Sequence, residues 1–333
     1  VESNEMLQIF TEEQIKELFF QKCIDLDVQI KEELMIRFIN FIKEKCVNRV
    51  INLSDCCLGF NSMVVLAEIL RNNFDLYSRI ILTKNNFGDE GIELLLESIE
   101  GNNNIVELNL SSNSLGASGG NSIFNFLLRQ NSIISLDLSS KEGLYRNRIC
   151  AEGVKLITKV LKNNFFLEKI DLSSNSIKNE GLKYIVNGLM SNITLQTLNL
   201  QNNEITEKGI SYLESKLTTS KLKHLNISCN PISDNGLISL GNCIGGKQLN
   251  EIVSLNISEC SVTFESFFPF IKKIAKNLKI QILISNKNNL SSNNKWHLLD
   301  DFFKKLSLKS LALGSCNLNQ NMKEISNIFK FNP

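Results

Sequence analysis

The sequence is poor in proline and glycine, with three and 17 of these residues in a chain of 333. Long flexible linkers are rich in such residues, so we expect none here. No run of about 18 apolar residues occurs, so we also expect no membrane span. Basic and acidic residues number 36 and 35, giving a net charge of +1. A nucleic-acid binder usually carries a clear basic excess, so we expect no nucleic acid as a partner.

Histidine is also rare, and His224 and His297 are the only two in the sequence. Neither has neighbours at the spacing of a metal site, nor a serine and an aspartate placed for nucleophilic catalysis. We therefore predict no catalytic residue, no metal, no cofactor and no small-molecule substrate. The nine cysteines are odd in number and include no Cys-x-x-Cys pair, which is typical of a reduced, cytoplasmic protein.

One pattern of apolar residues recurs along most of the chain. Segments such as Leu108-Asn109-Leu110 have apolar residues two apart, which predicts a strand with one buried face. A glycine then precedes apolar residues four and eight positions later, the spacing of one helix face. Between strand and helix stands an asparagine or a cysteine. We expect these residues to form a structural ladder, bonded to the backbone where each strand ends: Cys56, Asn85, Asn113, Asn147, Asn175, Asn203, Asn230, Cys260 and Cys316.

This pattern resembles the leucine-rich repeat, L-x-x-L-x-L-x-x-N/C-x-L, and its 28-residue units resemble the ribonuclease-inhibitor-like subfamily. The resemblance implies an α/β solenoid of about ten repeats, a horseshoe or arc. Its parallel β-sheet would line the concave face and its α-helices the convex face. We place the solenoid at residues 48–333, with irregular last repeats acting as a C-terminal cap, and a helical N-terminal cap at 1–47. In the ninth unit we assign Ile282 and Ile284 to the core, followed by Asn288 and Leu290, which requires one extra residue.

The resemblance implies a non-enzymatic scaffold or adaptor that binds one or more proteins of unknown identity. Two alternatives stay open at this point. The chain is also similar to the Ran-type leucine-rich-repeat proteins that activate GTPases. It could equally be the sensor or scaffold segment of a larger cytoskeletal or ciliary assembly, because a fold does not determine a function.

Two groups of residues are candidates for contact with a partner. The first is the exposed strand face, with Arg79, Lys84, Lys169 and His224, which is either a binding surface or a solvated consensus face. The second is an insertion at 140–148 that carries Tyr145, Arg146 and Arg148. It is either a contact loop or a neutral insertion, since longer loops are tolerated at little cost. Phe264 and Phe331 are further candidates, as exposed aromatic residues near the C-terminus.

Overall fold

The computed structural model describes residues 9–140, 144–214, 220–245, 251–276, 279–293, 295–306 and 308–329. The chain divides into two units, Val1–Leu156 with Asn163–Asn175, and Ile157–Lys162 with Ser176–Pro333. The first contains strands β1 (Val50–Asn52), β2 (Arg79–Ile81), β3 (Glu107–Asn109), β4 (Ser135–Asp137) and β5 (Lys169–Asp171). Its helices are α1 (Glu12–Asp25), α2 (Glu32–Lys45), α3 (Phe60–Asn72), α4 (Gly88–Ser98), α5 (Ala117–Leu127) and α6 (Cys150–Gly153).

The second unit contains strands β6 (Thr197–Asn199), β7 (His224–Asn226), β8 (Ser254–Asn256), β9 (Ile282–Ile284) and β10 (Ser310–Ala312). Helix α7 (Ile157–Asn163) ends at the boundary between the units. The helices that follow are α8 (Lys178–Leu189), α9 (Glu207–Glu214), α10 (Ser233–Ile244), α11 (Phe264–Ile274), α12 (Asp300–Lys305) and α13 (Met322–Phe329). Short 3₁₀ helices precede α12 and α13, at η2 (Trp296–Leu299) and η3 (Asn319–Asn321).

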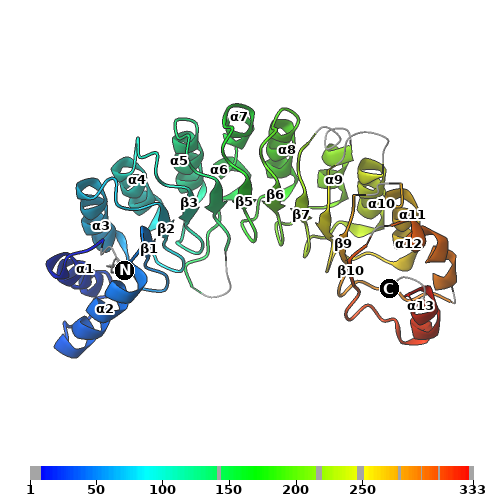
Figure 1. Cartoon of the computed structure of the whole chain (residues 1–333), viewed down its shortest axis with the longest axis horizontal. Helices are drawn as coiled ribbons and strands as arrows, with labels where there is room; N and C mark the ends of the chain where they lie inside the picture. Colours follow the sequence, from blue (N-terminus) through cyan, green and yellow to red (C-terminus); the bar gives the residue numbers. More distant parts are fainter. Residues whose placement is uncertain are drawn as a thin grey trace, which may run out of the picture. The chain divides into compact units, whose positions relative to one another are not determined.

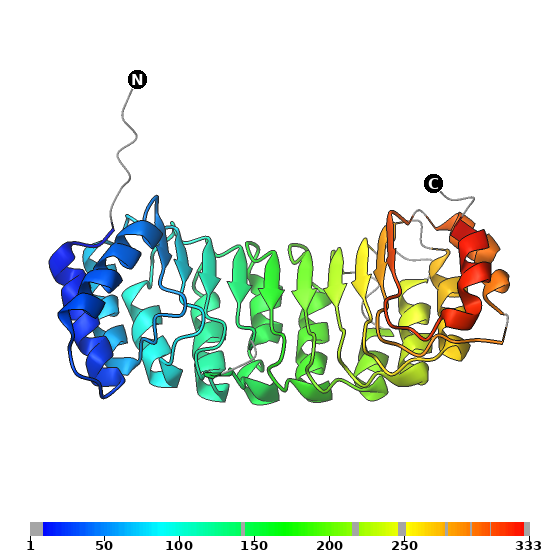
Figure 2. The same cartoon turned by 90° about the horizontal axis from the view of Figure 1, so that it is seen from below.

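Within each unit the strands pair in parallel with their neighbours in the sequence, as Figure 2 shows. Leu108 of β3 pairs with Ile80 on one side and with Leu136 on the other. All three side chains are buried, while their neighbours on each strand face outward. This alternation confirms the α/β repeat architecture that the apolar spacing predicts.

The helices of each unit cover one face of its strands (Figure 1). Helices α3, α4 and α5 contact one another in sequence order in the first unit, as do α8 to α11 in the second. The glycine of each repeat serves this helix contact. A Cβ added to Gly153 would lie 3.0 Å from the Cα of Ala117, so glycine lets the backbones of α5 and α6 approach closely.

Before the first strand, α1 and α2 form a helical pair. Thr11 and Gln14 form a capping box at the start of α1. Helix α1 contacts α3, and α2 contacts β1. The side chains of Phe38 and Ile42 in α2 are buried, but Leu34 on the same helix is 47% exposed.

The assignment of the ninth unit is wrong by one residue. Leu283 pairs with Leu255 and is buried, whereas Ile282 and Ile284 are half-buried on the outer face. Ser285 occupies the second core position and is fully buried, so no extra residue is needed. A run of apolar residues that ends in a buried serine hides the true register, because both faces of the strand look apolar.

Three further details differ from the sequence-based predictions. The fourth repeat has two short helices, α6 and α7, in place of one continuous helix. The apolar pattern of the last repeat fails at Ser326, yet α13 passes through that residue. Phe264 is buried, with its ring centroid 5.4 Å from that of Trp296, so it is no exposed contact residue. Phe331 lies outside the described residues.

Candidate functional site

The predicted ladder residues lie at the point where each strand ends. In the second unit, Nδ2 of Asn230 donates to the carbonyls of Leu200 and Ile227, both at 2.9 Å. Its Oδ1 accepts the N–H groups of Asn203 and Ile205 at 2.9 and 3.0 Å. Each such amide therefore joins its own repeat to the preceding one. Asn85, Asn113, Asn147, Asn175 and Asn203 are likewise buried and bonded to backbone groups.

Cysteine can supply only part of this pattern. The thiol of Cys260 lies 3.5 Å from the carbonyl of Ile227, and that of Cys316 lies 2.9 Å from the carbonyl of Ser285. A thiol offers a weak donor but no strong acceptor. The N–H of Ile232, which faces the Cys260 position, donates to the carbonyl of Asn230 instead. Burial raises the pKa of the Cys56 and Cys260 thiols to about 12, which keeps them protonated.

Asn288, placed at the asparagine position of the ninth unit, belongs to the same ladder. Its Oδ1 accepts the N–H of Cys260 at 2.9 Å, and its Nδ2 donates to the carbonyl of Ile257 at 2.8 Å. It stands three residues after Ser285, the second core position, as the repeat pattern requires.

On the exposed strand face, the side chain of the last residue in most strands is hydrogen-bonded within the chain. In most strands the last residue is an asparagine or aspartate whose Oδ1 accepts the N–H two residues later. Asn109 does this for Ser111 and also donates to Asp137 at 2.9 Å. These short polar side chains therefore form Asx turns, which terminate the strands.

The structure separates the predicted contact residues into groups. Arg79 and Lys169 lie in one row across β2 to β5, at the first residue of each strand. Arg79 is bound to Glu107 at 2.9 Å. Lys84 lies at the other end of β2, in a left-handed turn with φ of 58° that recurs before most ladder residues. His224 begins β7 in the second unit and is exposed, as predicted.

The described part of the insertion follows β4 and lies at the same ends of the strands as Lys84. Tyr145 is half-buried, and its carbonyl accepts the N–H of Ser114 at 2.9 Å. Arg146 and Arg148 are exposed. The loop is thus tied to the preceding repeat by its backbone and presents two guanidinium groups. Residues 141–143 of the insertion lie outside the described residues.

A second set of contacts between repeats was missed from the sequence. Acidic or amide side chains at the start of one helix cap the next helix in the stack. Asp89 accepts the N–H of Gly116 at 2.7 Å, and Asp234 accepts that of Thr263 at 2.7 Å. Asp25, the last residue of α1, caps α3 from the end of its own helix by accepting the N–H of Gly59 at 2.8 Å. The sequence indicated only favourable charge at helix starts, because the partner lies about 30 residues away.

Exposed apolar side chains occur on α1, on α2 and on the turn between them. Ile24, Val28, Ile30 and Ile36 are each at least 50% exposed. Val28 lines a groove of about 450 Å³, together with Phe38 and Lys22.

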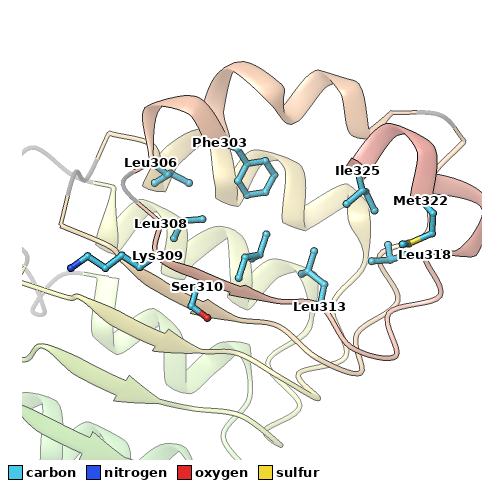
Figure 3. A pocket seen from close by; sticks show the side chains of 10 residues that line it. Phe303, Leu306, Leu308, Lys309, Ser310, Leu313, Leu318, Met322 and Ile325 are labelled. Carbon is cyan, nitrogen blue, oxygen red and sulfur yellow. The ribbon is translucent and has the colours of Figure 1, made fainter. Parts of the chain in front are cut away.

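A second apolar groove lies at the end of the second unit, along the unpaired edge of β10 (Figure 3). We call it the β10 groove. It has a volume of about 540 Å³. Its apolar lining comes from α12 and the segment after it, from the end of β10, and from α13: Phe303, Leu306, Leu308, Leu311, Leu313, Leu318, Met322 and Ile325.

The β10 groove exposes positions that are buried in the other repeats of the same unit. Leu311 and Leu313 are half-buried, whereas Leu255 and Ile257 at the same positions of β8 are fully buried. Met322 on α13 is 56% exposed. The core of the unit therefore reaches the surface where no further strand of the described residues covers it.

No helix among the described residues is long and apolar enough to cross a membrane. No group of three histidine, cysteine or acidic side chains among them could hold a metal ion.

A family model agrees with this repeat architecture. It is described as "Leucine Rich repeat" and matches residues 79–96, 101–124, 163–186, 191–213 and 220–241. No curated protein matches the chain. The solved structure "Leiomodin-1 Actin-Binding Site 2 (ABS2)" is similar at 24% identity and a TM-score of 0.32, covering 37% of this chain and 68% of that one. The tropomodulin C-terminal domain of Caenorhabditis elegans is similar at 15% identity and a TM-score of 0.37, covering 46% and 89%.

Proposed function

We propose that this chain, a leucine-rich-repeat protein, is a non-enzymatic scaffold that binds a protein partner in the β10 groove. The observation that carries the proposal is the exposure of Leu311 and Leu313 at repeat core positions. Apolar surface removed from water contributes about 25 cal/mol per Å², so covering these side chains favours binding. Leucine-rich repeats generally serve as protein-binding modules, which agrees with this assignment.

The strand face supports the proposal by contrast. The last residues of its strands, such as Asn109 and Asn226, have side-chain oxygens that already accept backbone N–H groups. A partner would have to compete with these bonds. The side chains of the groove are apolar and make no hydrogen bonds that a partner would have to replace, so the groove is the better surface for a stable contact.

We also propose a cytoplasmic location and membership of the ribonuclease-inhibitor-like subfamily. Reduced thiols at Cys260 and Cys316 donate to backbone carbonyls within the ladder, which favours a reducing compartment. The 28-residue step from Ile80 to Leu108 and on to Leu136 favours the subfamily.

Site-specific photo-cross-linking tests the proposed function. A benzophenone side chain is placed at Met322 in the groove, and in a control at Ile193, which is 64% exposed in the same unit but outside the groove. The captured partner is then purified and its dissociation constant measured. We expect Met322→Glu to weaken binding about tenfold, because a charge enters an apolar contact.

The control variant Ile193→Glu should leave the dissociation constant unchanged. Equal losses for both variants would refute the assignment of the groove. Stimulation of GTP hydrolysis by small GTPases on adding the chain would contradict its non-enzymatic role.

A further inference from the structure

We infer that the β10 groove takes an extended peptide segment of its partner, which joins β10 as one more parallel strand. The segment carries alternating apolar residues and acidic residues just before them. This inference rests on the proposed function, and it adds the conformation, direction and charge of the ligand.

The first argument comes from the backbone pattern between neighbouring strands. Toward the next strand, Ile257 donates to the carbonyl of Ile284 at 2.8 Å, and Glu259 donates to that of Asn286 at 2.9 Å. One repeat further on, Ser285 donates to Ala312 at 2.8 Å, and Lys287 to Gly314 at 2.7 Å.

At β10 the equivalent backbone groups have no hydrogen-bond partner among the described residues. Leu313 and Ser315 hold the positions of Ser285 and Lys287, yet no hydrogen bond joins their N–H groups to another described residue. The carbonyl of Lys309 is likewise unbonded within the described chain, although the equivalent carbonyl of Gln281 accepts two N–H groups. Two donors and one acceptor therefore face outward in the spacing that a parallel strand satisfies.

The second argument comes from the shape of the groove. In the interior of the unit, each pair of core side chains is covered by the pair on the next strand. Leu311 and Leu313 lack that cover and open into the groove, between Phe303 on α12 and Ile325 on α13. A segment with apolar residues two apart would place both of them there, because they share one face of a strand.

The third argument concerns charge. Lys309 stands at the mouth of the groove, just before β10, and forms no ion pair with another described residue. Lys305 ends α12, four residues before Lys309 in the sequence, with its ammonium 5.8 Å from the centre of the Phe302 ring. A parallel strand would bring its N-terminal flank to these two amines, so acidic residues are favoured there.

The chain provides its own probe for this inference. Residues 104–115 contain β3 and the ladder residue Asn113. In the structure, the N–H of Val106 donates to Ser78 on the preceding side, whereas that of Leu110 donates to Asp137 on the following side. A peptide that adds to β10 as the next strand would use the N–H of Val106 toward Lys309 and leave that of Leu110 pointing away.

The experiment measures binding of a labelled 104–115 peptide to the full chain by fluorescence anisotropy. We expect N-methylation at Val106 to weaken binding about tenfold, since it removes a hydrogen bond and leaves a carbonyl unpaired. N-methylation at Leu110, which adds the same bulk, should change affinity less than about twofold. Two glutamates added before Asn104 should tighten binding, and two lysines should weaken it.

Several results would overturn the inference. These are no binding of the peptide, equal effects of the two N-methyl groups, or self-association of the chain that Met322→Glu abolishes. If the purified partner needs Met322 but the peptide neither binds nor competes, the strand inference fails while the proposed function stands. If no partner contacts the groove, both fail.

Discussion

Removing the side-chain amide of Asn230 should destabilise the second unit substantially. Asn230 is fully buried, and its Oδ1 is the acceptor for the N–H groups of Asn203 and Ile205 at 2.9 and 3.0 Å. The change Asn230→Ala leaves both donors unpaired. A buried N–H without a partner costs about 1–3 kcal/mol, so we expect the free energy of unfolding to fall by about 3 kcal/mol.

Urea unfolding followed by tryptophan fluorescence is a suitable assay. Trp296 is the only tryptophan in the sequence, it is fully buried, and it lies in the same unit as Asn230. The variant Asn230→Cys should lose less than Asn230→Ala, because a thiol at this position can still donate, as Cys260 does to Ile227.

A matched control is Asn327→Ala, since Asn327 is exposed on α13 in that unit. Its effect should stay within about 0.5 kcal/mol. An unfolding midpoint for Asn230→Ala equal to that of the control would refute the reasoning about the ladder.

Three further predictions follow from the contacts between repeats and from the thiols. Burial opposes the charge of Asp234, but hydrogen bonds from Ser266 and Thr263 outweigh it and lower its pKa. The stabilisation from the charged Asp234 side chain should therefore be present above about pH 4 and disappear as the pH falls below its folded pKa. The urea midpoints of wild type and Asp234→Asn should then differ at pH 7 and converge in acid. Asp25→Ala should lower the free energy of unfolding by about 1–2 kcal/mol through loss of the α3 cap, measured by urea unfolding; an unchanged midpoint would contradict this. At pH 8, iodoacetamide should modify half-buried Cys57 but leave Cys260 intact, as mass spectrometry can show; the reverse order would contradict the assigned burial.

The repeat architecture could be predicted because each unit repeats the same local signals. Leu108, Leu110 and Asn113 lie within six residues of one another, so the strand and its final turn are readable from a short window. The same window fails in the ninth unit, where buried Ser285 replaces an apolar residue and Ile282 looks like core. There the register depends on pairing with β8, which no local pattern contains.

The candidate site was less accessible to sequence reasoning. Arg79 was singled out by its position on the strand face and Tyr145 by its place in the insertion, and the structure places them at opposite ends of the strands. The β10 groove has no motif of its own, because Leu311 and Leu313 are ordinary repeat residues. What distinguishes them is that no strand among the described residues covers them, and that depends on their position in the sheet.

Hydrogen exchange at two backbone amides tests most directly whether the β10 groove binds a peptide segment. The N–H groups of Leu313 and Ser315 have no partner among the described residues. We predict that both exchange rapidly in the free chain and slow markedly when the 104–115 peptide is added at saturating concentration, while the amide of Ser285, already bonded to Ala312, stays protected throughout. Unchanged exchange at Leu313 and Ser315 with bound peptide would contradict the account.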